Sequence, residues 1–152
     1  MRRMMIALAL AAIPLAGCGA EEGPAPTSSN PLPLQFGRAG GIAFSSVELR
    51  VQPDGSASLF VRDSPEASPP SSFTLSDEEL RQLAELLEAN PISSFPEPGP
   101  DSGCADCFTY RLSYGGGTYK ADDVTLGDEA GVVIGELGEL IARHEPPPTE
   151  AR

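Results

Sequence analysis

Two runs of alternating apolar and polar residues, joined by a tight turn, most constrain the fold of this chain. Apolar side chains occupy positions 47, 49 and 51 and again positions 57, 59 and 61, with mostly polar side chains between them. This period of two is typical of a strand with one buried face. The turn signal Pro53-Asp54-Gly55-Ser56 lies between the runs. The sequence therefore predicts a β-hairpin over residues 47–62.

The segment after this hairpin combines a predicted loop with the strongest helix signal in the chain. Residues 63–72 contain three prolines and are predicted to form a loop, because proline cannot pair within a sheet. Ser76 and Glu79 have the spacing of a capping box, and leucines at positions 80, 83, 86 and 87 form an apolar stripe. Asn90 precedes a proline and so predicts the end of this helix.

A second hairpin and a second helix follow. Residues 108–114 alternate in polarity, three glycines turn the chain, and residues 118–121 return it. Residues 128–143 carry apolar side chains at helical spacing, although three glycines leave this helix dependent on packing. With an opening strand at Leu34 and Phe36, the order is β-β-β-α-β-β-α. It predicts an α+β fold, in which two antiparallel β-hairpins form a small sheet with two helices on one face and a wet opposite face.

The beginning of the chain has the pattern of a bacterial lipoprotein signal. Two arginines precede an apolar run at residues 4–15, which is too short to span a bilayer, since a transmembrane helix needs about 20 residues. The run ends in LAGC at residues 15–18, which resembles a lipobox. That resemblance implies that residues 1–17 are removed as a signal peptide and that Cys18 is acylated. An ordinary secretory signal with a chance cysteine is the alternative.

The remaining chain is predicted to be one domain between two tails. Residues 18–33 form the lipidated cysteine and a flexible tether, residues 34–144 form a single α+β domain, and residues 145–152 form a disordered tail. Removal of residues 1–17 takes away two of the 10 basic residues and none of the 22 acidic ones, so the net charge changes from −12 to −14. This charge excludes nucleic acid as a partner and is expected to hold the domain off anionic headgroups.

The pair Cys104 and Cys107 has several interpretations. Once Cys18 is acylated, an even number of thiols remains in an oxidising compartment, which favours a structural disulfide. A redox pair would place Cys104 at a helix N-terminus, whereas here the pair runs into a predicted strand. A zinc site would need four ligands, and His144 is the only histidine and lies near the predicted tail. The disulfide is favoured, with redox chemistry, metal binding and free thiols left open.

Other residues of catalytic type do not form a recognisable set. Asp106, Asp122 and Asp123 could form a paired-carboxylate or calcium site, but EF-hand spacing is missing and such acids more often form a solvated surface. His144 lies far from any nucleophile motif, which excludes a Ser-His-Asp triad. The tyrosines of the second hairpin are expected to pack in the core or across strands: Tyr110, Tyr114 and Tyr119. The sequence predicts no enzyme activity, no cofactor and no metal.

Three short segments share a pattern with a known family. They are FGRAGG at residues 36–41, LSDEEL at residues 75–80, and the strand that follows Asp106 and contains Phe108 and Tyr110. From about Gln35 to Ile141 the order of elements resembles the emfourin family, small bacterial proteins whose namesake inhibits a thermolysin-like metalloprotease. The resemblance implies occlusion of a protease cleft without catalysis. The lipid anchor and the cysteine pair are departures from a soluble inhibitor.

These observations predict a membrane-anchored extracytoplasmic lipoprotein that acts as a non-enzymatic protein-binding module, with metalloprotease inhibition as its specific form. The candidate partner contacts are Asp106, Phe108 and Tyr110. The alternatives are a thiol-disulfide redox protein that uses Cys104 and Cys107, and a structural envelope lipoprotein. The expected partners are the bilayer, through acylated Cys18, and an unidentified protein, with a secreted protease as the candidate. The expected location is the outer leaflet of the cytoplasmic membrane or the outer membrane of a bacterium.

Overall fold

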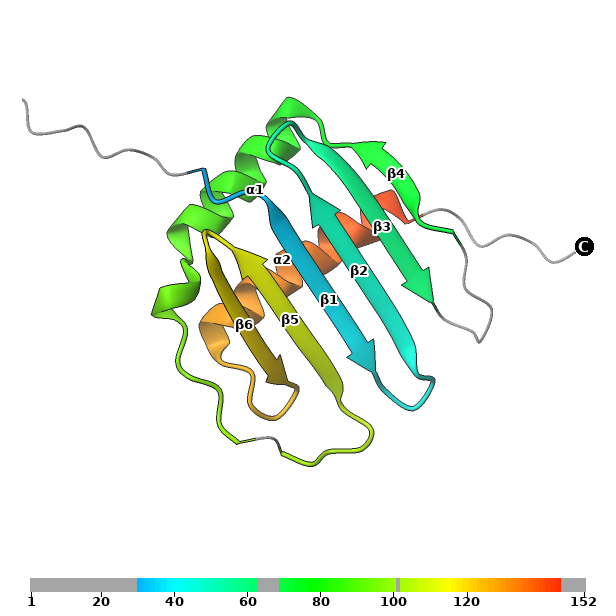
Figure 1. Cartoon of the computed structure of the whole chain (residues 1–152), viewed down its shortest axis with the longest axis vertical. Helices are drawn as coiled ribbons and strands as arrows, with labels where there is room; N and C mark the ends of the chain where they lie inside the picture. Colours follow the sequence, from blue (N-terminus) through cyan, green and yellow to red (C-terminus); the bar gives the residue numbers. More distant parts are fainter. Residues whose placement is uncertain (1–29, 63–68, 101, 146–152) are drawn as a thin grey trace, which may run out of the picture.

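Six antiparallel strands form one sheet, and two helices cover one of its faces (Figure 1). The computed structural model describes residues 30–62, 69–100 and 102–145, so the predicted signal, Cys18 and nearly all of the predicted tail lie outside the described residues. The predicted α+β class is confirmed. The elements are β1 (Leu34–Gly40), β2 (Ser45–Val51), β3 (Ser56–Arg62), β4 (Ser71–Thr74), α1 (Asp77–Ala89), the short 3-10 helix η1 (Ile92–Ser94), β5 (Phe108–Tyr114), β6 (Gly117–Asp122) and α2 (Asp128–His144).

Strand β1 lies at the centre of the sheet, whose strand order is β4-β3-β2-β1-β5-β6. It pairs with β2 on one side and β5 on the other, so Phe36 is opposite both Leu49 and Leu112. These three side chains are buried on the helix-covered face. The opening strand therefore joins the two predicted hairpins into one sheet with one core.

The prediction of a loop over residues 63–72 is wrong for its last two residues, which belong to strand β4. Ser71 and Ser72 belong to a strand that pairs with β3, while residues 63–68 lie outside the described part. Phe73 is the only apolar residue in β4, and it packs against the core. One apolar residue among four gives no period-two signal, which is why the sequence pattern did not reveal this strand.

Both helices form as predicted, and each is stabilised in a different way. The Ser76 hydroxyl accepts a hydrogen bond from the Glu79 N–H, and the Glu79 carboxylate accepts one from the Ser76 N–H, which completes the predicted capping box of α1. Helix α2 has no side-chain N-cap and instead packs an apolar face into the core. Its buried residues are Ala130, Val133, Leu137, Leu140 and Ile141.

The packed part of the chain begins before β1. Pro31 and Leu32, which the sequence assigned to the tether, are buried. The Gly115 N–H donates to the Pro31 carbonyl at 2.8 Å, and the Leu32 N–H donates to the Asn30 side-chain oxygen at 3.0 Å. Since these contacts fix the chain onto the β5–β6 turn, residues 31 and 32 belong to the folded domain and not to the expected tether.

The lone histidine is part of the fold and not of a tail. His144 ends α2, and its ring stacks on Phe73 of β4 with ring centroids 4.2 Å apart. Its Nε2 lies 3.1 Å from Glu79 Oε1 at the start of α1. Hydrogen bonds from the Ser76 N–H, the Ser76 hydroxyl and His144 lower the pKa of Glu79 from 4.5 to about 2. This cluster links β4, α1 and α2.

We expect the folded state to lose stability as the pH falls from about 4.5 toward about 2, and to hold the full contribution of Glu79 above that range. Within it the unfolded chain binds a proton at Glu79 and the folded chain does not, so acid favours unfolding. Glu79→Gln should lower the free energy of unfolding near neutral pH by about 1 kcal/mol and flatten this pH dependence. Urea unfolding at a series of pH values measures both effects.

Glu85→Gln is the matched control, because Glu85 is an exposed acid of the same helix that pairs only with Arg81. It should leave the slope of stability against pH close to that of the unmodified chain. Parallel curves for the unmodified chain and Glu79→Gln would contradict the assignment.

Candidate functional site

Three connections meet at one end of the sheet and form the candidate site, which we call the tip. They are the β1–β2 turn at residues 41–44, the loop before β5 at residues 102–107, and the β6–α2 connection at residues 123–127. The Gly41 N–H donates to the Cys107 carbonyl at 3.4 Å, and the Asp123 N–H donates to the Phe108 carbonyl at 3.1 Å. The tip lies at the lower end of Figure 1, opposite the end where β1 begins.

A disulfide closes the middle loop of the tip. Cys104 and Cys107 are bonded, with a Cα–Cα distance of 5.5 Å, which confirms that the pair forms a disulfide. The loop runs directly into β5, and not into a helix. The Cys104 N–H also donates to the Ser102 hydroxyl at 3.3 Å, so the loop is braced from within. Its backbone therefore has a fixed course on the surface.

Two glycines of β1 and its turn allow this loop to pack against the sheet. Gly40 has a φ of +126°, and a Cβ added there would lie 2.4 Å from the Cys107 carbonyl oxygen. Gly41 has a φ of +72°, and a Cβ there would lie 2.8 Å from the Phe108 ring. A side chain at Gly40 would push the disulfide loop away from the turn, and one at Gly41 would displace the Phe108 ring.

The two acids of the β6 end hold the tip together. The Asp122 carboxylate accepts hydrogen bonds from Ser102 at 2.5 Å and from Thr125 at 2.8 Å, which lower the pKa of Asp122. Asp123 accepts from the Phe108 N–H at 2.6 Å and from the Tyr110 hydroxyl at 2.7 Å. These carboxylates act as structural acceptors. Within the described ranges, no three His, Cys, Asp or Glu side chains gather closely enough to hold a metal ion.

The three predicted partner contacts occupy different places at the tip. Asp106 is exposed on the disulfide loop. Phe108 is half-buried, with the Arg38 guanidinium 4.9 Å above its ring. Tyr110 is also half-buried, and burial together with its bond to Asp123 raises its pKa to about 12. Asp106 is thus available to a partner, while Phe108 and Tyr110 support the loops from below.

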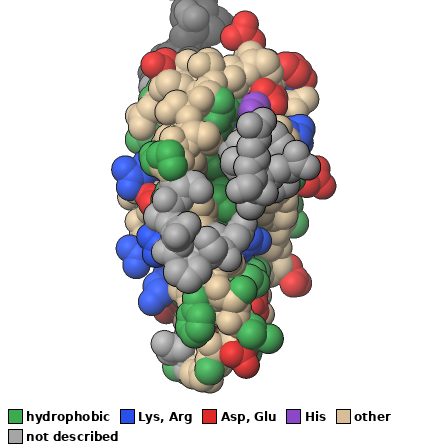
Figure 2. Space-filling model, turned by 90° about the vertical axis from the view of Figure 1, so that its right-hand side faces the viewer, with side chains coloured by type: hydrophobic (Ala, Val, Ile, Leu, Met, Phe, Trp, Pro, Cys, Tyr) green, Lys and Arg blue, Asp and Glu red, His purple; other side chains and the backbone are tan. Residues whose placement is uncertain are grey.

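Exposed apolar side chains at the tip were not identified from the sequence. Ile42 and Phe44 of the β1–β2 turn are 82% and 84% exposed, and Val124 of the β6–α2 connection is 66% exposed. Hydrophobic side chains are visible at the lower end of the molecule in Figure 2. Phe44 has a φ of +50°, an uncommon conformation for a bulky residue. The sequence signal that could have revealed them is the run of apolar residues directly after the glycines at positions 40 and 41.

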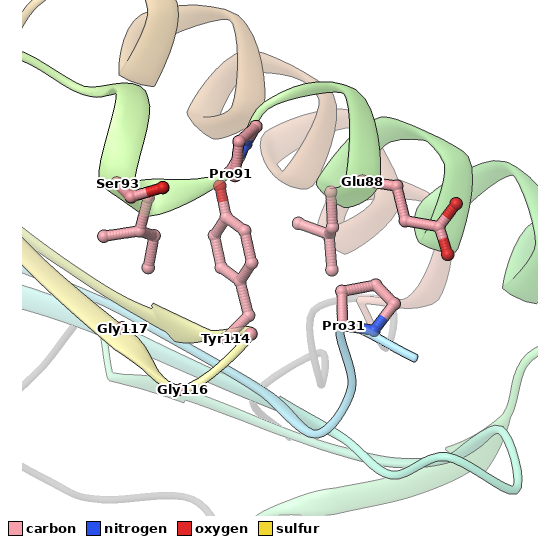
Figure 3. A pocket seen from close by; sticks show the side chains of 10 residues that line it. Pro31, Glu88, Pro91, Ser93, Tyr114, Gly116 and Gly117 are labelled. Atoms are coloured by element: carbon pink, nitrogen blue, oxygen red, sulfur yellow. The ribbon is translucent and has the colours of Figure 1, made fainter. Parts of the chain in front are cut away.

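A cavity of about 490 Å³ lies at the opposite end of the molecule (Figure 3). Pro31, Glu88, Pro91 and the β5–β6 turn line it together with Tyr114. The Tyr114 hydroxyl donates to the Asn90 carbonyl, and burial raises the Tyr114 pKa to about 12. Glu88 and Tyr114 are the ionisable side chains of this lining.

Comparison of the sequence with models of protein families, and with curated protein sequences, finds no match to either. Across the described part of the chain, no helix is long and apolar enough to cross a membrane.

The packing of the tip predicts opposite effects for two glycines of β1. Gly40→Ala should lower the free energy of unfolding by about 2 kcal/mol or more, since it combines a backbone collision with a left-handed φ. Gly37→Ala should leave stability unchanged or raise it by up to about 1 kcal/mol, because a Cβ at Gly37 meets no atom within 4 Å. Chemical unfolding compares them, and similar losses in both would refute the close contact at Gly40.

Proposed function

We propose that this protein is a lipid-anchored, extracytoplasmic and non-enzymatic protein-binding module that holds its partner at the tip. The observation that carries the proposal is the exposure of Ile42 and Phe44 on a turn braced by a disulfide-closed loop. Large apolar side chains that project fully into solvent from a fixed backbone are typical of binding surfaces. A partner that covers them gains apolar burial without ordering the loop first.

The position of the tip supports an anchored arrangement. The described chain begins at Asn30, and β1 then runs from that end of the sheet to Gly40 at the tip. A lipid on Cys18 would hold the Asn30 end near the membrane through a tether of about a dozen residues. The tip lies at the far end of the strands from this attachment (Figure 1).

The resemblance to the emfourin family makes a secreted, thermolysin-like metalloprotease the first partner to test. In such a complex the tip would enter the protease cleft, with Phe44 and Ile42 as apolar anchors and Asp106 beside them. The disulfide would resist distortion of the loop by the protease. Thiol-disulfide exchange is a weaker proposal, since the pair precedes a strand and lacks the helix N-terminus that activates such cysteines.

Lipid attachment predicts a defined mass at the new N-terminus. The chain isolated from host membranes should begin at Cys18 and carry the mass of a diacylglyceryl group, with or without a further palmitate-type chain on the amine. Cys18→Ser should abolish the lipid and release the chain from the membrane fraction. Cys104→Ser is the control and should keep the lipid. An unmodified Cys18, or a mature chain that begins elsewhere, would refute the anchor.

Partner binding predicts a specific effect of the apolar tip. Phe44→Ser and Ile42→Ser should each weaken binding of the partner, or inhibition of a thermolysin-like protease, by about tenfold or more, because each removes a large buried apolar contact. Val132→Ser is the matched control, since Val132 is 55% exposed but lies on α2. Titration of captured partner or of protease activity gives the affinities.

Equal affinity in the tip variants and the Val132→Ser control would show that binding lies elsewhere on the molecule. The absence of any captured partner and of protease inhibition would favour the structural envelope lipoprotein instead.

A further inference from the structure

The face of the sheet that the helices leave open carries most of the basic residues of the described chain. Alternation along the strands places Arg50, Arg62, Arg111 and Lys120 on this face, and all four are exposed. Two acids share the face. Glu48 accepts a hydrogen bond from Arg50 Nε at 2.8 Å, and the Asp122 carboxylate accepts from Ser102 and Thr125. Both acids are thus engaged within the protein.

Arg111 and Lys120 form an uncompensated pair of cations. They are directly opposite each other on β5 and β6, an unfavourable position for like charges. None of the ion pairs among the described residues includes either of them. Those ion pairs join glutamates to Arg50, Arg81, Arg143 and His144. An anionic ligand would remove this repulsion.

A hollow lies beside this pair. Gly37 of β1 is opposite Arg111 on one side and Glu48 on the other, and no atom occupies the space above it within 4 Å of an added Cβ. The resulting cavity has a volume of about 340 Å³, and Phe60 and Lys120 also line it. Glu48 lines the cavity too, but its carboxylate is paired with Arg50. The side formed by Arg111 and Lys120 is basic and has room for the phosphate of a lipid headgroup.

The helix-covered side of the domain is rich in acids. The exposed acids of the two helices are Asp77, Glu78, Glu85, Glu88, Asp128, Glu129, Glu136 and Glu139. Figure 2 shows Lys and Arg side chains along its left side, which is the open sheet face, and acids mainly at the top and right. Among the described residues, the open sheet face and the helix-covered face therefore differ in charge.

We propose that the open sheet face binds the surface of an anionic bilayer, with lipid phosphates at Arg111 and Lys120. An anchor at Cys18 favours this occupant over a soluble polyanion, because the segment from Cys18 to Asn30 extends to about 40 Å at most and keeps the face near the headgroups. This choice of a bilayer over a soluble polyanion rests on the proposed lipidation, whereas the basic face does not. The expectation that the net charge holds the whole domain off anionic headgroups does not apply to this face.

The test uses the mature chain, residues 18–152, with Cys18→Ser, so that any binding comes from the protein surface and not from a lipid. Co-sedimentation at low salt should show binding to vesicles of phosphatidylcholine mixed with phosphatidylglycerol, and little to phosphatidylcholine alone. Binding should weaken as salt is added. The double variant Arg111→Gln/Lys120→Gln should bind the anionic vesicles about tenfold more weakly.

Arg81→Gln/Arg143→Gln is the matched control, since it removes the same charge from exposed positions on the two helices. It should bind as the parent chain does. Equal losses in the two double variants, or equal binding to neutral and anionic vesicles, would overturn the proposal. Binding to soluble polyglutamate but not to anionic vesicles would also overturn it and would indicate an acidic polypeptide as the ligand. The mass at Cys18 decides the anchor independently of all these outcomes.

Discussion

The pairing of β1 on both of its edges is the interaction on which the rest of the structure depends. Its partners β2 and β5 are separated in the chain by a strand pair, a helix and a long loop, and only β1 connects them. The same pairing buries Phe36 between Leu49 and Leu112. Because β1 ends at Gly40, its pairing with β5 also brings the β1–β2 turn against the disulfide loop. The pairing of β1 with β2 and β5 thus positions both the core and the tip.

Local signals in the sequence were sufficient for most elements of the fold. The alternation at residues 47–62 and the spacing of Ser76 and Glu79 act within a few residues, so they can be read without knowing the fold. Strand β4 and the role of His144 could not be predicted in this way. Both depend on a contact between segments about 70 residues apart, in which Phe73 stacks on His144.

One part of the candidate site could likewise be predicted from local sequence signals, and another part could not. The cysteine pair is three residues apart, and its disulfide could be inferred from composition and the expected oxidising compartment. The exposure of Ile42 and Phe44 could not, since apolar residues near a turn are usually covered by neighbouring segments. The net charge, which adds residues from opposite faces, also does not reveal which cations are neighbours. Only the register of the strands shows that Arg111 and Lys120 are neighbours.

The two edge strands of the sheet bear on whether copies of the chain can pair with one another. An open strand edge is a template for pairing with another chain, and such pairing leads to aggregation. Here one edge is β4, which is only four residues long and has hydroxyl side chains at Ser71, Ser72 and Thr74. The other edge is β6, which carries the charged Lys120. Short, polar or charged edges resist intermolecular strand addition, so neither edge of the described sheet favours pairing with a strand of a second copy.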